Sequence, residues 1–295
     1  MPSARVAAFA KVNLTLRVLA REAGGYHQLE TLFCRIDLAD DVIVHVRDDD
    51  TRSIECAGAD VGPPERNLAL RAAVAYAERD GWPRGFAIEI EKRIPVGGGL
   101  GGGSADAGAV LRALNSLNPR PLPVHELLAI AGPLGADVPF LTGVAPLALA
   151  WGRGERMLAL PALPQRELAL VLPPLSVNTA EAYDWLAAAR GTGEASPRPA
   201  LHPLAAVTTW DGVVRFSEND FEPPVFAQRP ELGEIYARLA AVPGVELARM
   251  SGSGSTLFAL LAKDVELRSV AQAAASRVLA ARTLDEVPLV GVAAD

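Results

Sequence analysis

The sequence predicts an α+β protein, and three observations lead to this fold class. Stretches in which apolar and polar residues alternate are typical of strands with one buried face. Apolar residues also recur at helical spacing in stretches bounded by Gly or Pro. The two kinds of stretch are mixed without the strict βα alternation of parallel α/β sheets. The chain has 295 residues and is 50% hydrophobic, which allows one large domain or two of ordinary size with a sizeable core.

The N-terminal third is predicted to contain three strands and one helix. Alternation marks the strands, at residues 11–18, 41–47 and 86–94. The first of them, KVNLTLRV, places Lys11 and Asn13 on one polar face, for which exposure to solvent is the simplest explanation. Residues 67–80 are rich in Ala and Leu and are followed by Gly81 and Pro83, so a helix is expected to end there.

Two helices and a loop are predicted in the middle of the chain. Apolar residues at helical spacing predict a helix over residues 110–117, and residues 125–131 are expected to form a short helix. GADVPFLTG, residues 135–143, has Gly at both ends and Pro139 inside, so it is expected to be a loop.

The C-terminal part again mixes strands and helices. Residues 168–179 are predicted to be a buried strand that runs into a loop. Residues 190–203 contain Gly, Ser and several Pro and are expected to be exposed and mobile. Residues 248–262 contain a Gly/Ser turn that leads into an apolar strand, and residues 269–281 are expected to form a helix.

Charge, cysteine content and the N-terminal sequence limit the class of protein. The formal net charge is -7, so neither nucleic acid nor an anionic membrane is expected as the main partner. The two cysteines, Cys34 and Cys56, fit a reducing compartment better than a disulfide framework. Lys11 and Asn13 interrupt the N-terminal apolar stretch, and no apolar run reaches the length of a membrane-spanning helix. We expect a cytoplasmic protein.

The segment RIPVGGGLGGGSADAG, residues 93–108, has glycine at six of seven consecutive positions. A flexible linker would have polar flanks, whereas this run joins a predicted strand to a predicted helix. An ordered loop at a helix N-terminus offers free N–H groups and the positive end of the helix dipole to a phosphate. The spacing matches GxGxxG, but the run comes too late in the chain for a Rossmann fold, and no Lys precedes Ser104 as a Walker A motif requires.

Five blocks of the sequence resemble the GHMP kinases, in the order of that family and across nearly the whole chain. They are AKVNLTLRV (10–18), GYHQLETLF (25–33), IPVGGGLGGGSADAG (94–108), LGADVPFL (134–141) and SGSGSTLFAL (251–260). The resemblance implies two α+β domains, which we place at residues 1–158 and 159–295, with the active site in the cleft between them. It also implies an ATP-dependent kinase for a small alcohol, and the blocks are most similar to a branch whose substrate carries a cytidine group.

The resemblance further implies two catalytic residues. Asp137 is expected to accept the proton of the attacking hydroxyl, although Asp in such a loop most often bonds its own backbone. Lys11 is expected to orient Asp137 and the hydroxyl and to neutralise developing charge. This pairing is chemically reasonable because positioning and charge stabilisation outweigh base strength in phosphoryl transfer.

The backbone amides of the glycine run are expected to wrap the triphosphate of ATP. The residues expected to bind the nucleotide are Pro95, Val96, Gly97, Gly98, Gly99, Leu100, Gly101, Gly102, Gly103, Ser104, Ala105 and Asn67. Ser104 can be an N-cap, or its hydroxyl can reach a phosphate or the Mg²⁺ of the nucleotide. Asn67 can cap its helix or touch the adenine side. Because Mg²⁺ held by phosphates and water needs no protein cage, no metal ligand is assigned.

Six residues are expected to bind the substrate: Asn13, Tyr26, His27, Phe33, Thr179 and Tyr183. By the resemblance, Asn13 contacts the sugar alcohol, Tyr26 stacks on cytosine and His27 hydrogen-bonds the edge of the base. Phe33 can be a core residue, which is slightly favoured, or an aromatic wall of the pocket. Thr179 and Tyr183 are expected to line the pocket from the second domain, where the SGSGS turn closes the cleft or is an ordinary hairpin turn.

Three other functions remain open on the sequence. One is a sibling kinase for homoserine or mevalonate, but these substrates carry no cytosine for residues 25–33 to bind. Another is a non-catalytic nucleotide-binding regulator, which would need neither Lys11 nor Asp137. A dehydrogenase is a more distant alternative. The expected partners are ATP and a small-molecule substrate, and the chain is expected to be a monomer or a weak homodimer.

Overall fold

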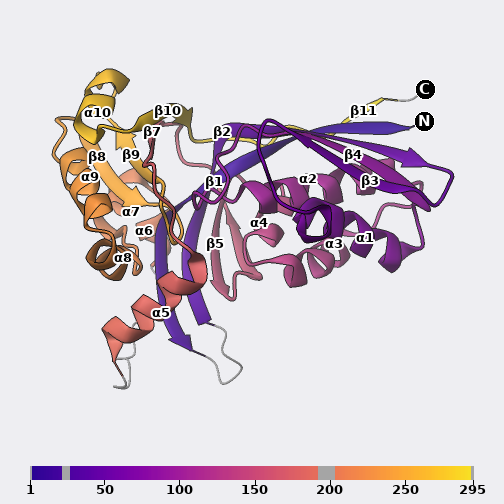
Figure 1. Cartoon of the computed structure of the whole chain (residues 1–295), viewed down its shortest axis with the longest axis horizontal. Coiled ribbons are helices and arrows are strands. Elements are labelled where there is room, and N and C mark those ends of the chain that lie inside the picture. Colours follow the sequence, from indigo (N-terminus) through magenta and orange to yellow (C-terminus); the bar gives the residue numbers. More distant parts are fainter. Residues whose placement is uncertain (1, 22–26, 192–202, 294–295) are drawn as a thin grey trace.

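The computed structural model describes residues 2–21, 27–191 and 203–293. Within these ranges the chain forms two halves that lie side by side, each made of one sheet and its helices (Figure 1). These halves are called layers below. The long strands β1 and β2 belong to the first sheet and extend into the region between the two layers (Figure 1). This arrangement places N-terminal strands beside helices of the second half of the chain.

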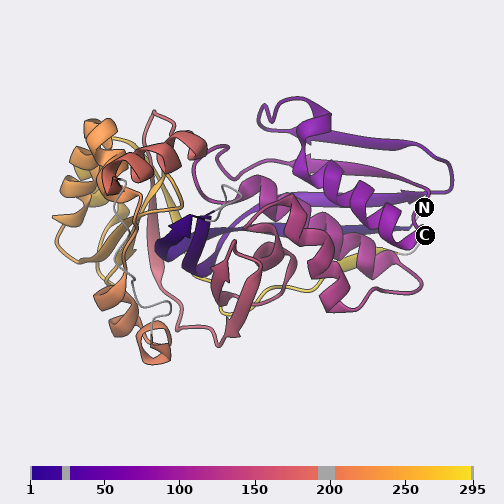
Figure 2. The same ribbon diagram turned by 90° about the horizontal axis from the view of Figure 1, so that it is seen from below.

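The first sheet has seven strands. They are β1 (Ser3–Arg21), β2 (His27–Arg47), β3 (Arg52–Ala57), β4 (Gly85–Glu91), β5 (Leu147–Gly152), β6 (Arg156–Leu160) and β11 (Gly291–Ala293). Their order is β11-β1-β2-β4-β3, with β5 beside β2 and β6 beside β5, and β3 pairs with β4 in parallel. Four helices lie against this sheet (Figure 2): α1 (Leu68–Asp80), α2 (Gly102–Leu117), α3 (Val124–Ala131) and α4 (Val138–Thr142). Single 3₁₀ turns lie at Pro64–Arg66 and Gly132–Leu134.

The second sheet has four antiparallel strands in the order β10-β7-β9-β8. They are β7 (Glu167–Leu172), β8 (Val245–Met250), β9 (Leu257–Leu261) and β10 (Arg277–Arg282). Its helices are α5 (Thr179–Arg190), α6 (Leu204–Val207), α7 (Trp210–Phe216), α8 (Glu222–Gln228), α9 (Pro230–Ala240) and α10 (Leu267–Ala274). After β10 the chain returns to the first sheet, where β11 pairs with β1. The proposed domain boundary between residues 158 and 159 falls inside β6.

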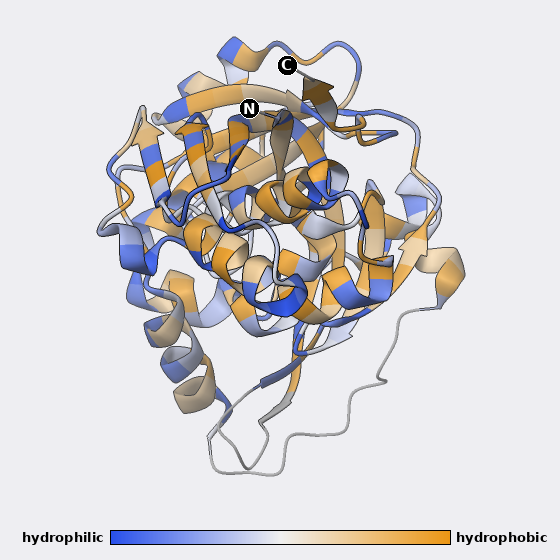
Figure 3. Ribbon diagram, turned by 90° about the vertical axis from the view of Figure 1, so that its right-hand side faces the viewer, coloured by the Kyte–Doolittle hydropathy of each residue, from blue (hydrophilic) through white to orange (hydrophobic). Residues whose placement is uncertain are grey.

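The apolar faces predicted from alternation form the core. Val12 and Leu14 of β1, Val42 and Val44 of β2 and Ile88 of β4 are all buried in one cluster with the inner faces of α1 and α2. A second cluster packs the second sheet against α5, α8, α9 and α10. Figure 3 shows apolar residues concentrated along the strands and the inward faces of the helices. No helix in the described part of the chain is long and apolar enough to cross a membrane.

Most of the predicted elements are confirmed. The predicted strand at residues 41–47 lies in β2, and the one predicted at residues 86–94 is β4, which ends earlier, at Glu91. The helix predicted after Asn67 is α1, which ends where Gly81 adopts the left-handed conformation (φ 70°). The Gly/Ser turn at residues 251–255, called the serine turn below, joins β8 to β9. The strand predicted at residues 11–18 is part of the longer β1.

Three predictions are wrong, each for a local reason. Residues 135–143 are not all loop, because α4 begins directly after Asp137 and places Pro139 in its first turn, where a proline needs no N–H partner. The helix predicted at residues 269–281 ends at Ala274, and residues 277–282 form β10, because they complete the second sheet beside β7. Lys11 and Asn13 are not solvent-exposed, since both are at least 97% buried (2% and 3% exposed).

Candidate active site

A cleft of about 590 Å³ lies where the two layers meet. Its N-terminal wall contains Lys11, Asn13, Phe33, Asn67, Asp137 and all residues from Pro95 to Ser104, and its other wall contains Thr179, Tyr183, Phe221, Gly252 and Ser253. Most residues predicted from the sequence to bind nucleotide or substrate therefore line one cavity. Ala105 is buried in α2, and its N–H donates to Gly101 O. Tyr26 lies outside the described residues.

Residues 95–104, called the glycine loop below, need glycine where the chain turns closely past its neighbours. Gly99 has φ 78°, and a Cβ there would lie 2.1 Å from Ser251 O. Gly101 has φ 74°, and a Cβ there would lie 3.1 Å from the Lys11 side chain. L-residues rarely adopt this backbone conformation. The glycines thus allow the loop to contact both Lys11 and the serine turn.

The last three residues of the glycine loop form the first turn of α2, and this helix N-terminus is open to the cleft. Gly101 is the N-cap, and no side chain among the described residues caps this terminus. The first-turn N–H groups and the positive end of the helix dipole therefore remain available to an anion in the cleft. Ser104 is the third residue of α2, so the prediction that it is an N-cap is wrong, and its place in the cleft lining leaves the phosphate or Mg²⁺ alternative open.

Lys11 and Asp137 meet at the side of the cleft next to the glycine loop. Lys11 Nζ lies 3.3 Å from Asp137 Oδ2. It also donates to Asn13 Oδ1 (2.7 Å) and to Gly99 O (3.0 Å). The Lys11 side chain is 3% exposed and that of Asp137 is 29% exposed. The ammonium is therefore fixed by three oxygen partners, while the carboxylate remains accessible from the cleft.

A second buried charge cluster, Lys92 with Asp40 and Asp106, lies beside the glycine loop and was not predicted from the sequence. Lys92 Nζ is ion-paired with both carboxylates, and its distance to Asp106 Oδ2 is 2.6 Å. Asp40 Oδ1 also accepts from Arg93 N (2.5 Å) and Ile94 N (2.8 Å), at the entrance of the loop. Burial raises the pKa of Asp106 to about 7, against the opposing effect of Lys92.

This cluster contributes to the wall of the cleft that the glycine loop forms, because Lys92 and Asp106 both line the cavity. Asp106 Oδ1 is buried and has no hydrogen-bond partner among the described residues. The sequence contained one weak indication of this cluster, because Lys92 and Asp106 lie on either side of the glycine run. Asp40 had none, because it comes from β2, far away in the sequence.

An aromatic group lies at the cleft, where Tyr183 and Phe221 are among the lining residues and His27, which was predicted to bind the base, is not. His27 stacks on Tyr183 with ring centroids 4.4 Å apart and an interplanar angle of 17°. Phe221 contacts Tyr183 edge to face at 4.9 Å, and burial raises the pKa of the Tyr183 hydroxyl. Thr179 Oγ1 lies 3.0 Å from Ser253 Oγ of the serine turn. The sequence did not single out Phe221, whose segment resembles no block used above.

Two alternatives were predicted for Phe33 and for Asn67, and in the structure each residue is compatible with both. Phe33 is 1% exposed, stacks on Phe140 (4.9 Å) and still lines the cleft, with Lys11 Nζ 5.6 Å from its ring centroid. Asn67 caps α1, since its Oδ1 accepts from Ala69 N (2.9 Å), and it also lines the cleft. The serine turn is both a hairpin connection and a wall of the cleft.

Comparison with known proteins gives family matches in both halves of the chain. The model of the GHMP kinases N-terminal domain matches residues 67–143, and that of the GHMP kinases C-terminal domain matches residues 210–280. A 4-diphosphocytidyl-2-C-methyl-D-erythritol kinase of Parvibaculum lavamentivorans is 41% identical over 275 residues, which are 90% of this chain and 91% of the relative. A protein of the same name from an Anaeromyxobacter species is 41% identical over 298 residues, covering 95% and 91%.

Solved structures extend this likeness to the fold. A crystal structure of a 4-(cytidine 5'-diphospho)-2C-methyl-D-erythritol kinase matches with a TM-score of 0.75 at 39% identity, covering 95% of this chain and 98% of the other. Homoserine kinase from Cytophaga hutchinsonii matches with a TM-score of 0.68 at 19% identity, covering 99% and 97%. The second likeness shows a shared fold alone.

Proposed function

This chain belongs to the 4-diphosphocytidyl-2-C-methyl-D-erythritol kinases of the GHMP family, and on that premise we propose how its cleft performs the reaction. The enzyme transfers the terminal phosphoryl group of ATP to the 2-hydroxyl of 4-diphosphocytidyl-2-C-methyl-D-erythritol, a step in non-mevalonate isoprenoid precursor biosynthesis. The observation that carries the proposal is the meeting of Lys11, Asp137 and the glycine loop in one cavity.

Proton transfer and charge stabilisation fall to the Lys11–Asp137 pair. A bond forms between the 2-hydroxyl oxygen and the γ-phosphorus as the bond to the β,γ-bridging oxygen breaks, and ADP leaves. Asp137 accepts the hydroxyl proton, because its carboxylate is the accessible member of the pair. Lys11, fixed by Asn13 and Gly99, stabilises the charge on the transferring group.

The nucleotide is bound by the glycine loop and the uncapped N-terminus of α2. Backbone N–H groups there donate to the phosphates, and a helix N-terminus favours their negative charge. The donor chemistry of this wall also fits a magnesium ion on the nucleotide: Ser104 presents a hydroxyl, and Asp106 has a buried carboxylate oxygen without a partner among the described residues. When bound, Mg²⁺ supplies charge neutralisation at the phosphates.

The acceptor is bound at the aromatic end of the cleft. Tyr183 lines the cleft and stacks on His27, so its flat ring suits a pyrimidine base, and Phe221 contacts it edge to face. Asn13 faces the cleft beside Lys11 and contacts the sugar alcohol. Both walls of the cavity come from one chain, so a single subunit carries a complete site and a monomer or weak homodimer suffices.

The experiment that tests the function is ADP release from ATP with three alcohols offered separately. We expect turnover with 4-diphosphocytidyl-2-C-methyl-D-erythritol and none with homoserine or mevalonate, which lack the base that the aromatic end binds. Turnover with homoserine alone would refute the substrate and retain the kinase. ATP binding without turnover on any alcohol would favour a nucleotide-binding regulator.

A further inference from the structure

The segment Ser217–Asp220 lies against the edge of β1 opposite β2. Leu16 N donates to Glu218 O (2.7 Å), and Asp220 N donates to Leu16 O (2.9 Å), so the two stretches run parallel over a few residues. Lys11 belongs to the same strand. The segment is therefore bonded directly to the strand that carries the catalytic ammonium.

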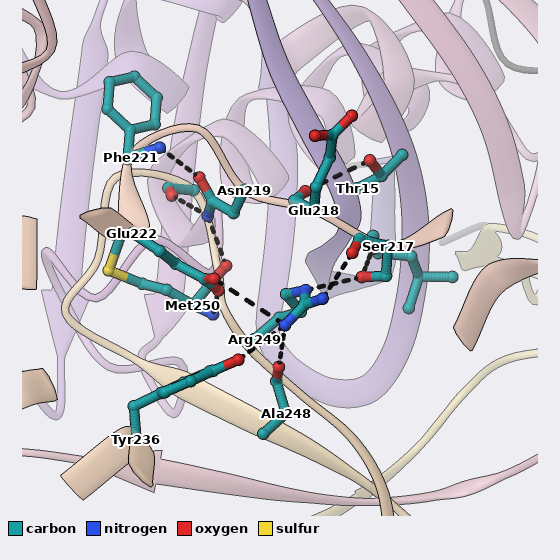
Figure 4. Close-up of polar contacts among 12 residues, drawn as sticks. Thr15, Ser217, Glu218, Asn219, Phe221, Glu222, Tyr236, Ala248, Arg249 and Met250 are labelled. Atoms are coloured by element: carbon teal, nitrogen blue, oxygen red, sulfur yellow. Dashed lines mark hydrogen bonds and ion pairs between the residues drawn. The ribbon is translucent and has the colours of Figure 1, made fainter. Parts of the chain in front are cut away.

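Asn219, within this segment, uses its amide nitrogen to hold the serine turn and the end of β8 that precedes it (Figure 4). Its Nδ2 donates to Met250 O (2.7 Å) and to Gly252 O (2.8 Å), and its Oδ1 accepts from Phe221 N (2.9 Å). The residue is 5% exposed, so water does not replace these bonds. Two donors on one atom and an acceptor on the other are what an asparagine offers and an isosteric aspartate does not.

The serine turn that Asn219 holds rests in turn on the glycine loop. Ser251 Oγ donates to Gly99 O (2.9 Å), and Thr256 N donates to Gly98 O (3.3 Å). Gly99 O is also the acceptor for Lys11 Nζ (3.0 Å). These donors hold the carbonyl oxygens of the loop in place, and a carbonyl that rotated toward the phosphates would repel them.

The same segment is anchored from its other side. Arg249 Nη2 donates to Ser217 O (2.5 Å), and Arg249 Nη1 donates to Tyr236 Oη (2.8 Å) (Figure 4). Glu222 Oε1 accepts from Met250 N (2.8 Å). Because these contacts fix the backbone on both sides of Asn219, its amide is a rigid link between β1 and the serine turn.

We propose that Asn219 is a positioning residue for the phosphoryl transfer, an inference that rests on the proposed function. Through the serine turn it keeps Gly99 O at hydrogen-bond distance from Lys11 Nζ. The phosphates and the acceptor hydroxyl are then aligned for the transfer. Misplacement of reacting groups by an ångström costs on the order of a hundredfold in rate. Asn219 touches neither reactant; it acts through Ser251 and Gly99.

The test is a double-mutant cycle on Asn219→Asp and Ser251→Ala. Each single variant is expected to lower kcat at least about tenfold while the KM of the alcohol stays within about twofold of wild type. Because both residues act through one contact, the double variant is expected to be no slower than Asn219→Asp. The control is Asn178→Asp, an exposed N-cap whose oxygen accepts from Ala180 N and which an aspartate replaces, so its kcat should equal that of wild type.

Several outcomes would overturn the inference. Wild-type kcat in Asn219→Asp, or effects that multiply in the double variant, would show that Asn219 does not act through the serine turn. If Asn219→Asp does not fold, Asn219→Ser takes its place in the cycle, because it removes the amide without burying a charge; failure of both to fold would make the residue structural only. If the wild-type enzyme phosphorylates homoserine instead, the proposed substrate is refuted. The double-mutant cycle is then measured with homoserine as the acceptor, and it still tests the role of Asn219.

Discussion

Lys11 Nζ and Asp137 Oδ2 lie 3.3 Å apart, although Lys11 is in β1 and Asp137 is the residue before α4. The ammonium is buried and the carboxylate is partly exposed to the cleft. In the proposed mechanism this contact pairs the base with the charge stabiliser beside the glycine loop. Three of the predictions below test parts of this cavity, and the fourth tests a buried carboxyl outside it.

Asp137→Asn is expected to remove the proton acceptor and retain the side-chain shape. We expect kcat to fall by about 10²–10⁴-fold, the range that general base catalysis contributes, while the affinity for ATP changes by less than about twofold. Lys11→Ala should reduce turnover in the same direction. The measurements are steady-state ADP release and calorimetric titration of ATP.

The control for this pair is Asp264→Asn, an exposed position after β9, which should behave as wild type. Turnover near the wild-type rate in Asp137→Asn would exclude the carboxylate as the base.

Gly99→Ala is expected to disrupt nucleotide binding. The added Cβ would meet Ser251 O at 2.1 Å, and φ is 78°, so the loop has to move. We expect the affinity for ATP to fall at least about tenfold, because the backbone amides lose their alignment on the phosphates.

The matched variant is Gly81→Ala, which also has a positive φ (70°) but has no atom within 4 Å of the added Cβ. It should lose about 1 kcal/mol of folding stability from backbone strain and keep its ATP affinity. Equal ATP affinities of the two variants would mean that the glycine loop does not bind the phosphates.

Tyr183→Ala is expected to weaken the binding of the cytidine substrate more than that of ATP. The ring stacks on His27 at 4.4 Å, and loss of a base-stacking face costs about 1–3 kcal/mol, so the KM of the alcohol should rise about fivefold or more. Tyr183→Phe keeps the face and should stay near wild type. A parallel rise in the KM for ATP would indicate that the aromatic end belongs to the nucleotide instead.

Glu222→Gln is expected to change how stability depends on pH. Burial raises the pKa of Glu222 to about 7 from 4.5, against the hydrogen bond from Met250 N and the charge of Arg249. Between these two values the folded protein holds a proton that the unfolded chain releases, so wild-type stability falls as pH rises through the window. The glutamine variant lacks this titration. Between pH 4.5 and pH 7, its free energy of unfolding should therefore rise relative to that of wild type by up to about 3 kcal/mol.

Urea unfolding at several pH values measures this difference. Glu231→Gln, an exposed position in α9, should differ from wild type by a constant amount across the same range. If the difference in unfolding free energy between Glu222→Gln and wild type were also constant across this pH range, Glu222 would not have the raised pKa.

Local pattern was sufficient for most of the elements and for the glycine loop. Alternation in β2 and β4 and the Asn67 cap of α1 are encoded by neighbouring residues, because strand and helix periods and caps are local properties. Errors arose where tertiary contacts override propensity. Residues 277–282, RVLAAR, which were predicted to continue a helix, are a strand because β7 pairs with them.

The contacts that we propose to be catalytic depend on packing. A local pattern places Lys11 on a polar strand face and Asp137 in a glycine-flanked segment, but only the folded chain brings them within 3.3 Å and buries the lysine. The Lys92 cluster and the bonds of Asn219 to Met250 and Gly252 join residues distant in sequence. Residue type determines what a side chain can bond; which partner it finds is decided when the two layers pack together and exclude water from the groups between them.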